Sequence, residues 1–377
     1  MTSTLEGMET PALLLDEARM DRNIERMRKQ VQRLGVAFRP HVKTSKCIEV
    51  ARRMMGSWEG PITVSTLLEA DYFAGRGVKD ILYAVCIAPN KLDHVLALQA
   101  RGVRMSIILD SVDAAQMVVE RLADAPDIGV LIEVDSDGHR SGVKPDSAEL
   151  LRIGLTLEAS GIAVRGVMTH AGSSYDCRSA DAIRAMAEQE RTAIVLAAER
   201  LRAAGIACPV VSLGSTPTGL YAEHLEGVTE LRAGVYVFFD LVMAGLGVCA
   251  VDDIALSVLA TVIGHQREKG WTLLDAGWMA MSRDRGTASQ PVDQGYGLVC
   301  DLEGRPLRDY ILVGANQEHG IMAARPGSGA DGLHLPIGTQ VRILPNHACS
   351  TAAQYGEYHV VAPPLQLKAT WQRFSGW

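Results

Sequence analysis

The sequence predicts an α/β fold: a (β/α)8 TIM barrel followed by a mainly β C-terminal domain. Two observations carry this prediction. Eight short runs rich in β-branched residues alternate with helical patterns over the first part of the chain. After about residue 245, β-rich runs follow one another with loops of Gly, Pro and Asp between them. Strand–helix alternation is typical of parallel strands joined by right-handed crossovers, and eight such units close a barrel.

The eight predicted barrel strands come in regular order along the chain. They span residues 36–40, 62–66, 80–85, 104–110, 129–135, 163–169, 209–213 and 230–237. The clearest helices between them are 18–34, 111–122 and 181–203, the last rich in strong helix formers. A doubly wound open sheet is the alternative, but no Gly-x-Gly-x-x-Gly follows the first strand.

The predicted β domain contains strands at 255–264, 271–275, 309–313 and 340–344. We expect the early segment 11–16 to join it as a further strand, with Asp16 capping the first barrel helix. The predicted domains are therefore a barrel at 17–245 and a β domain at 246–377, joined by residues 1–16.

Composition excludes several classes of function. The 377 residues carry a net charge of −7, which argues against a nucleic-acid partner. The sequence contains no run of 18 apolar residues, so no membrane span is predicted. The N-terminus has no secretory signal pattern. The seven cysteines form no CxxC pair, so we expect a reduced, cytoplasmic protein without disulfides.

Lys43 is the sharpest catalytic candidate, because it follows the first predicted strand in Arg39-Pro40-His41-Val42-Lys43. Active sites of such barrels lie at the carboxyl ends of the strands. A lysine desolvated there has a lowered pKa, and its free amine can bond covalently to a carbonyl group. The alternative is a solvated surface lysine, which the Pro-His-x-Lys context disfavours.

Two small-residue turns are candidates for binding a phosphate. Gly214-Ser215-Thr216 follows the seventh predicted strand, and Gly234-Val235 lies within the eighth. Backbone N–H groups and hydroxyls at such turns hold phosphates, and barrels favour this position. Either turn alone is weak, since Gly-Ser-Thr is a common turn sequence.

His347 and Cys349 are candidate metal ligands. On a strand, alternate residues face the same way, so both side chains could meet one ion. Imidazole with thiolate favours zinc over magnesium. Two protein ligands are fewer than the usual three of a catalytic zinc, so water and substrate would complete the shell. The alternative is a buried cysteine beside a structural histidine.

Five stretches together resemble a known family. They are residues 39–44 (RPHVKT), 169–172 (THAG), 214–217 (GSTP), 316–320 (NQEHG) and 345–349 (PNHAC). The chain resembles fold-type III pyridoxal-phosphate (PLP) enzymes, which have an alanine-racemase-type barrel followed by a β domain. Within that group it is similar to the branch of D-serine dehydratases, D-threonine aldolases and bacterial D-threo-3-hydroxyaspartate dehydratases, over essentially the whole chain.

The resemblance implies a role for each candidate. Lys43 would bond the cofactor aldehyde, Arg140 would approach its phenolic oxygen, and His170 would stack on its ring with Tyr175 nearby. Arg232 would face the pyridine nitrogen, a position at which the relatives vary. The residues that would bind the cofactor phosphate are Ser215, Thr216, Gly234, Val235 and Tyr236. His347 and Cys349 would bind a divalent metal: zinc, manganese or magnesium.

The resemblance also implies a reaction on a small D-amino acid substrate. Dehydratases of this branch carry Cys two residues after the metal-binding His, whereas D-threonine aldolases often carry Asp, so Cys349 favours loss of water over aldol cleavage. The expected products are a 2-oxo acid and ammonia from D-threo-3-hydroxyaspartate or D-serine. An aldolase giving glycine and an aldehyde remains the alternative, and a non-catalytic PLP-binding protein is a third. Related enzymes form homodimers, so we expect a dimer.

Overall fold

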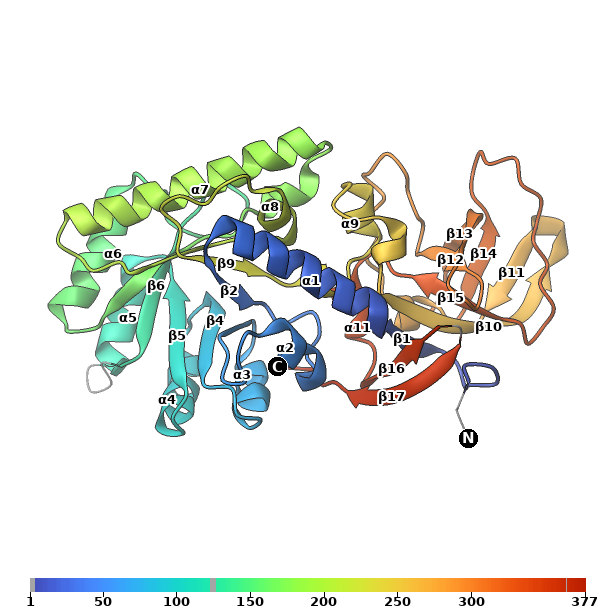
Figure 1. Cartoon of the computed structure of the whole chain (residues 1–377), viewed down its shortest axis with the longest axis horizontal. Helices are drawn as coiled ribbons and strands as arrows, with labels where there is room; N and C mark the ends of the chain where they lie inside the picture. Colours follow the sequence, from blue (N-terminus) through green and yellow to red (C-terminus); the bar gives the residue numbers. More distant parts are fainter. Residues whose placement is uncertain (1–3, 123–126, 364) are drawn as a thin grey trace. The chain divides into compact units, whose positions relative to one another are not determined.

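The computed structural model describes residues 4–122, 127–363 and 365–377 (Figure 1). Residues 1–3, part of the N-terminus for which no secretory signal is predicted, lie outside the described residues. The chain divides into two compact units, residues 26–234 with 376–377, and residues up to 25 with 235–375. The domain boundaries expected from the sequence, 17–245 and 246–377, stay a prediction.

The first unit contains a parallel sheet of eight strands in the order β2-β9-β8-β7-β6-β5-β4-β3. The sheet closes on itself, because His41 pairs with Thr63 and the Val42 N–H donates to the Thr63 carbonyl at 3.0 Å. The barrel prediction is confirmed. The strands are β2 (Ala37–Pro40), β3 (Ile62–Val64), β4 (Asp80–Cys86), β5 (Arg104–Leu109), β6 (Gly129–Glu133), β7 (Val164–Met168), β8 (Val210–Leu213) and β9 (Glu230–Ala233).

The last barrel strand is shorter than predicted. It ends at Ala233, and Val235–Val237 form a 3-10 turn, because the Phe238 and Phe239 N–H groups both bond back to the Val235 carbonyl. The β-branched residues that extended the prediction to 237 are buried in this turn instead.

Helices follow the barrel strands in sequence (Figure 1). They are α2 (Ile48–Met54), α3 (Leu67–Ala74), α4 (Leu92–Ala100), α5 (Val112–Leu122), α6 (Ala148–Ala159), α7 (Ala180–Ala203) and α8 (Thr216–Tyr221). In α7 the buried residues Ile183, Ala187, Glu190 and Ile194 recur at helical spacing, which gives this helix one inward stripe. The Ser179 hydroxyl caps its start by accepting from the Ala182 N–H.

The helix α1 (Glu17–Leu34) precedes the first barrel strand. Asp16 caps it as predicted, since its carboxylate accepts from the Arg19 N–H at 2.9 Å.

The second unit is built on a nine-stranded sheet in the order β11-β14-β13-β12-β15-β10-β1-β16-β17. β1 (Ala12–Asp16) lies antiparallel to β10 and parallel to β16, which confirms that the N-terminal segment joins the β domain. Leu5, Leu14, Leu259 and Val361 are buried together beside this junction. The other strands are β10 (Leu256–Gln266), β11 (Trp271–Leu274), β12 (Leu298–Cys300), β13 (Pro306–Ala315), β14 (Gly320–Ala324), β15 (Gln340–Leu344), β16 (Glu357–Ala362) and β17 (Gln366–Gln372).

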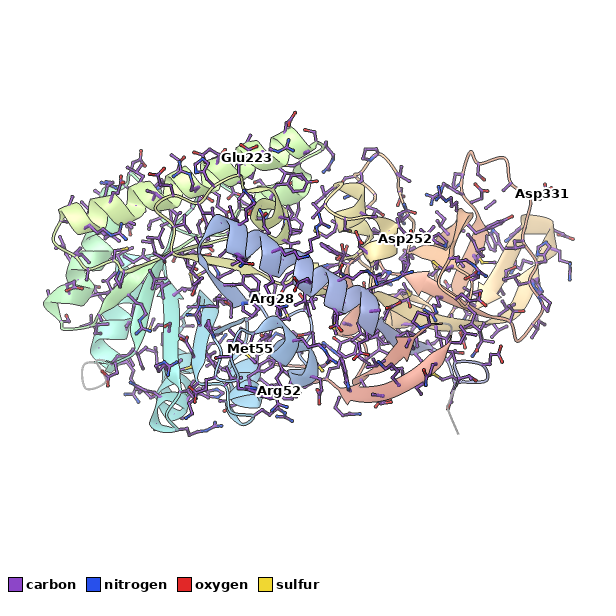
Figure 2. The ribbon with its side chains drawn as sticks, in the orientation of Figure 1. Arg28, Arg52, Met55, Glu223, Asp252 and Asp331 are labelled. Carbon is purple, nitrogen blue, oxygen red and sulfur yellow. The ribbon has the colours of Figure 1, made fainter. Side chains whose placement is uncertain are left out.

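Charged side chains are spread over the exposed parts of both units, as the labelled Glu223, Asp252 and Asp331 illustrate (Figure 2). Among the helices of the described residues, none combines the length and the apolar character that crossing a membrane requires.

Candidate functional site

Four of the predicted cofactor residues stand at the carboxyl ends of barrel strands. Lys43 is exposed in the turn after β2, Arg140 lies in the loop after β6, His170 follows β7, and Arg232 is on β9. Burial lowers the pKa of His170 to about 4, and the charges of Lys43, Arg140 and Arg232 act in the same direction, although a bond to the Gly214 carbonyl opposes them. The charges of three cations from different strands therefore act on one neutral imidazole.

Arg232 is buried and fixed at both ends of its guanidinium. One nitrogen donates to the Ser212 hydroxyl at 2.6 Å, and the other donates to the Thr169 carbonyl at 2.6 Å. The Ser212 hydroxyl in turn donates to the Glu230 carboxylate at 2.6 Å. Burial lowers the pKa of Arg232, while Glu230 and other carboxylates counteract this effect. The chain of bonds holds a cation inside the barrel.

Glu230 also connects Arg232 to a second arginine, the half-buried Arg39. Arg39 donates to Glu230 at 2.8 Å and to Asp80 at 2.7 Å. These polar side chains satisfy one another across the interior of the barrel, as buried charges require. None of Glu230, Ser212 and Asp80 was predicted as a site residue, because no local motif marks them.

The imidazole of His170 is held from its Nδ1 side. Nδ1 lies 3.0 Å from the Gly214 carbonyl, so it is the protonated nitrogen of the neutral ring. The ring lies 6.3 Å from that of Tyr175, tilted by 51°. The structure thus brings His170 and Tyr175 together as predicted neighbours.

A buried carboxylate of α7, Glu190, ties the two loops around His170. It accepts the Ala171 N–H at 2.9 Å and the Gly214 N–H at 3.2 Å. Burial raises the pKa of Glu190, while bonds from Thr218 and the two N–H groups lower it. Sequence analysis missed this residue, because it is one of many acidic residues in a long helix.

The turn predicted to bind phosphate begins α8. The Ser215 hydroxyl accepts the Thr218 N–H at 3.2 Å, and the Ser215 N–H donates to the Thr218 hydroxyl at 3.1 Å. The Ser215 hydroxyl also lies 3.0 Å from that of Ser174. Both polar groups of Ser215 are therefore used to shape the turn. Thr216 is the next residue and is buried.

The predicted metal ligands are not on a strand, and this expectation is wrong. β15 ends at Leu344, and His347 is the residue that begins the short helix α11 (Ala348–Ala352), which contains Cys349. The two side chains nevertheless interact. Burial lowers the pKa of His347, but Cys349 and Asp284 raise it more, to about 11.

Two aspartates that sequence analysis missed hold this segment. Asp284 accepts from His347 Nδ1 at 2.7 Å. Asp240 is buried and accepts from the Ala348 N–H at 3.0 Å. His347 lowers the pKa of the Asp284 carboxyl, although burial opposes this shift. An imidazole oriented by one carboxylate, and a thiol whose backbone segment is held by a second carboxylate, form a donor set suited to a divalent metal.

A second group of possible ligands lies at the barrel end. Cys86, Asp110 and Glu133 bring their ligand atoms within 4.8 Å of one another. Burial, Glu133 and Asp110 raise the pKa of the Cys86 thiol far above its usual range, so it is protonated and donates to Glu133 at 3.1 Å. Glu133 also accepts from Ser141 at 3.0 Å and lies 3.5 Å from Arg140. We interpret the group as support for the Arg140 loop.

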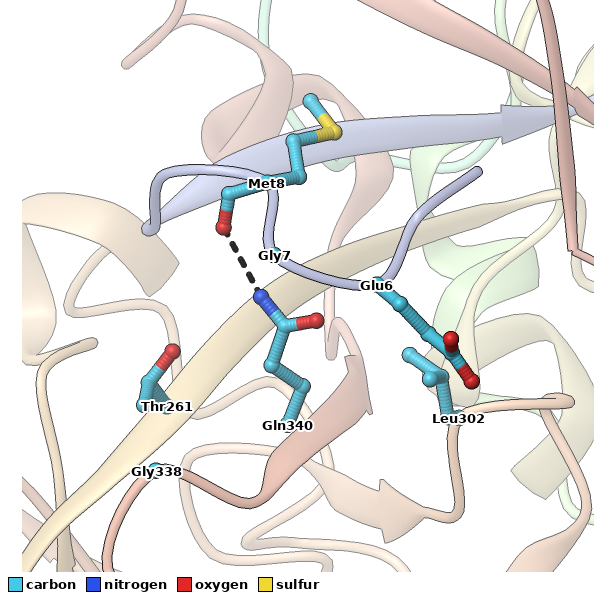
Figure 3. Close-up of a pocket in the computed structure, with 7 residues that line it drawn as sticks. All are labelled: Glu6, Gly7, Met8, Thr261, Leu302, Gly338 and Gln340. Atoms are coloured by element: carbon cyan, nitrogen blue, oxygen red, sulfur yellow. Dashed lines mark hydrogen bonds between the residues drawn. The ribbon is translucent and has the colours of Figure 1, made fainter. Parts of the chain in front are cut away.

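A pocket of about 410 Å³ lies in the second unit (Figure 3). Its lining contains one ionisable side chain, Glu6, and the Gln340 amide there donates to the Met8 carbonyl at 2.8 Å. It contains none of the predicted site residues.

Comparison with known proteins accounts for both units. Residues 15–242 match the family model "Alanine racemase, N-terminal domain", and residues 255–361 match "Putative serine dehydratase domain". The D-threo-3-hydroxyaspartate dehydratase of Delftia sp. (strain HT23) is 54% identical over 100% of both chains. The D-serine dehydratase of Dictyostelium discoideum is 30% identical over 99% of this chain and 98% of the relative. A D-threonine aldolase of Arthrobacter sp. is 29% identical over 92% and 87%.

Solved structures agree with these relatives. A histidine-to-alanine variant of D-threo-3-hydroxyaspartate dehydratase aligns with a TM-score of 0.97 at 54% identity, covering 100% of this chain and 98% of that one. A cysteine-to-alanine variant in the metal-free form aligns with a TM-score of 0.96 at 53% identity over 100% of both chains. The replaced residues are two positions apart, the spacing of His347 and Cys349. The chain belongs to the fold-type III PLP-dependent lyase family that includes D-threo-3-hydroxyaspartate dehydratase, the D-serine dehydratases and the D-threonine aldolases.

Proposed function

We propose that this protein uses PLP and a divalent metal to eliminate water from D-β-hydroxy amino acids, with D-threo-3-hydroxyaspartate or D-serine as substrate. The products are a 2-oxo acid and ammonia. The observation that carries the proposal is the placement of Lys43, Arg140, His170 and Arg232 at the carboxyl ends of barrel strands, where the three cations help to lower the pKa of the His170 imidazole. Three cations at one barrel end suit a ligand with several anionic groups, and an exposed lysine amine among them suits an aldehyde.

The residues present fit PLP, and each has a part in holding it. Lys43 would bond its aldehyde, Arg140 would pair with its phenolic oxygen, and His170 and Tyr175 would line its ring. Arg232, fixed by Ser212 and Thr169, would serve the ring nitrogen. The phosphate is held at the start of α8 and after β9 by Ser215, Thr216, Gly234, Val235 and Tyr236. The N–H and the hydroxyl of Ser215 both bond to Thr218 at the start of α8. Ser215 would therefore contribute to phosphate binding by shaping the turn.

When bound, PLP supplies an electron sink for the charge left at the substrate Cα. Lys43 Nζ would be the base that accepts the substrate's α-proton. Arg232 cannot readily give a proton to a neighbouring ring nitrogen, because a guanidinium stays protonated in proteins, and Glu230 and other carboxylates counteract the lowering of its pKa by burial. His170 stays neutral at physiological pH, since its pKa is lowered to about 4.

His347 and Cys349 fit a divalent metal, which would supply Lewis-acid assistance to the departing hydroxyl. Imidazole and thiolate are donors that zinc prefers, and manganese or magnesium are the alternatives for this pair. Since His347 Nδ1 faces Asp284, Nε2 is the nitrogen left for the ion.

Aldol cleavage to glycine and an aldehyde is the second candidate. The similarity to a D-threonine aldolase favours it as a side activity, because a base at the β-hydroxyl would use the same pocket to break Cα–Cβ. Cys349, in the position where aldolases often carry Asp, favours the dehydratase.

The test is direct. We expect PLP-loaded protein with zinc or manganese to release ammonia and a 2-oxo acid from D-threo-3-hydroxyaspartate or D-serine. Glycine and an aldehyde as the main products would instead establish the aldolase.

We also propose a homodimer in the reducing cytoplasm. All seven cysteines are free, which agrees with a reducing compartment. Size-exclusion chromatography with light scattering tests the dimer, and a monomer at micromolar concentration would contradict it.

A further inference from the structure

The imidazole of His347 has one of its two nitrogens committed to a carboxylate. Asp284 Oδ2 lies 2.7 Å from His347 Nδ1. An ionised carboxylate only accepts hydrogen bonds, so Nδ1 keeps its proton, and the ring becomes the Nδ1–H tautomer when Nε2 gives up its proton to a metal ion. This tautomer is the one that binds a metal through Nε2.

We infer that Asp284 is the positioning residue of the metal centre: it fixes the tautomer and ring direction of His347 so that Nε2 and the Cys349 thiol meet one divalent ion. The inference rests on the proposed function, because it presumes that these two residues bind the metal.

The loop that carries Asp284 is itself bonded to the segment that contains His347 and Cys349. Asp284 Oδ1 accepts the Gly286 N–H at 2.8 Å, which fixes the carboxylate from its other oxygen. The Asp284 carbonyl accepts from the Asn346 amide at 3.1 Å, one residue before His347. The Ser282 and Ser350 hydroxyls lie 3.2 Å apart. These hydrogen bonds therefore tie the loop to the segment.

Backbone strain marks the same loop. Ser282 has φ of 73° and ψ of 167°, a left-handed conformation that costs a serine energy. The Ser282 hydroxyl accepts the Asp284 N–H at 3.2 Å, so the strained residue sets the start of the turn that presents the carboxylate. Such strain persists only where surrounding contacts maintain it.

A second aspartate holds the backbone beside Cys349. Asp240 Oδ2 accepts the N–H of Ala348, the residue between His347 and Cys349, and its Oδ1 accepts the Met243 N–H at 2.9 Å. Asp240 thus fixes the backbone between the ligands, whereas Asp284 fixes the imidazole. A helix of five residues gains the rigidity that a two-residue metal site needs.

A role for Asp284 as a third ligand is not supported. Within the described residues, the one group of three possible ligands with mutual distances under 4.8 Å is Cys86, Asp110 and Glu133. Asp284 is not in it, and its Oδ2 faces Nδ1, the nitrogen directed away from the ion.

The experiment measures metal binding by the PLP-loaded full chain. After chelation and dialysis, Co²⁺ is titrated into wild type, D284A and D284N, and binding is followed by the visible cobalt bands and the thiolate-to-cobalt absorption. We expect D284A to weaken Co²⁺ binding roughly 10–100-fold, the range typical of lost outer-shell partners. D284N should weaken it by a similar factor, because an amide NH₂ turned toward Nδ1 favours the wrong tautomer.

The matched control is E357Q. Glu357 lies 3.4 Å from His359 Nε2, so these two residues of β16 form another carboxylate–imidazole pair in the same unit. We expect its Co²⁺ dissociation constant to stay within twofold of wild type. Far-UV circular dichroism and bound-PLP absorbance establish that each variant is folded.

The outcomes separate the two proposals. Wild type without thiolate-to-cobalt absorption would overturn the metal site itself. Wild type that binds Co²⁺ through the thiol, together with D284A of equal affinity and spectrum, would overturn the inference and leave the proposed function in place. If D284A fails to fold, D284N decides, and an unchanged dissociation constant in D284N would overturn the inference.

Discussion

Glu190 gives the most quantitative prediction, because one buried oxygen serves two loops of the site. Its Oε1 accepts the N–H groups of Ala171 and Gly214, and its side chain is fully buried. The Gly214 carbonyl in turn accepts from His170. Replacing Glu190 by Ala leaves two buried N–H groups without an acceptor.

Each lost acceptor costs about 1–3 kcal/mol, so the hydrogen bonds alone account for roughly 2–6 kcal/mol. Domains are stable by only about 5–15 kcal/mol, so this is a large share. For a unit of this size it corresponds to a fall in Tm of roughly 5–20 °C. We also expect weaker PLP binding, because both loops flank His170.

The control is E190Q, whose amide oxygen can keep both N–H bonds. Burial raises the pKa of Glu190, so its favourable contribution is complete below its unfolded pKa and is lost as pH rises through the folded value. E190Q should therefore match or exceed the Tm of wild type at pH 7 and gain nothing at pH 4. Differential scanning calorimetry and PLP titration measure both effects. An E190A variant within 2 °C of wild type and with unchanged PLP affinity would refute the reasoning.

Three further predictions concern single side chains. K43A should lose the yellow colour of bound PLP, and a variant that keeps the wild-type absorption band would contradict the cofactor assignment. H347A and C349A should keep this colour but lose most lyase activity, as should wild type after chelation; full activity in metal-free buffer would argue against the metal. Burial raises the pKa of Cys47 to about 12 and that of Cys208 to about 11, so both should stay unlabelled by thiol reagents at pH 8 in native protein. Mass spectrometry after labelling checks this, and rapid modification of Cys208 would contradict the prediction.

The barrel could be predicted because its strands are short apolar runs buried on both faces. β6 (Gly129–Glu133) is buried at every position, and its sequence is a continuous run of mostly apolar residues that predicts a buried strand. The predicted helices 18–34, 111–122 and 181–203 each begin within one residue of the observed helix.

Four strands of the β domain had weaker signals and were missed. β12 has three residues, below the length at which alternation can be recognised. β14 is rich in Gly and Ala, which have low β propensity. The outer strand β17 alternates between exposed and half-buried residues and has no apolar run, and β16 is paired with it.

The site was predictable where its residues follow strands or lie close in sequence. Lys43 and His170 follow β2 and β7, and His347 and Cys349 are two residues apart, although they begin a helix instead of occupying a strand. Asp284 is 63 residues from His347 in the chain, so no spacing argument could link them. Glu190 and Glu230 likewise act through folded contacts that leave no local motif.

The central claim is that this chain removes water from a D-β-hydroxy amino acid. The most direct measurement is mass-spectrometric identification of the products after PLP- and zinc-loaded or manganese-loaded protein is incubated with D-threo-3-hydroxyaspartate, D-serine and D-threonine. The account predicts ammonia with the corresponding 2-oxo acid, oxaloacetate or pyruvate, from one of the first two substrates. Glycine and an aldehyde as the main products, or unchanged substrates with fully loaded protein, would contradict it.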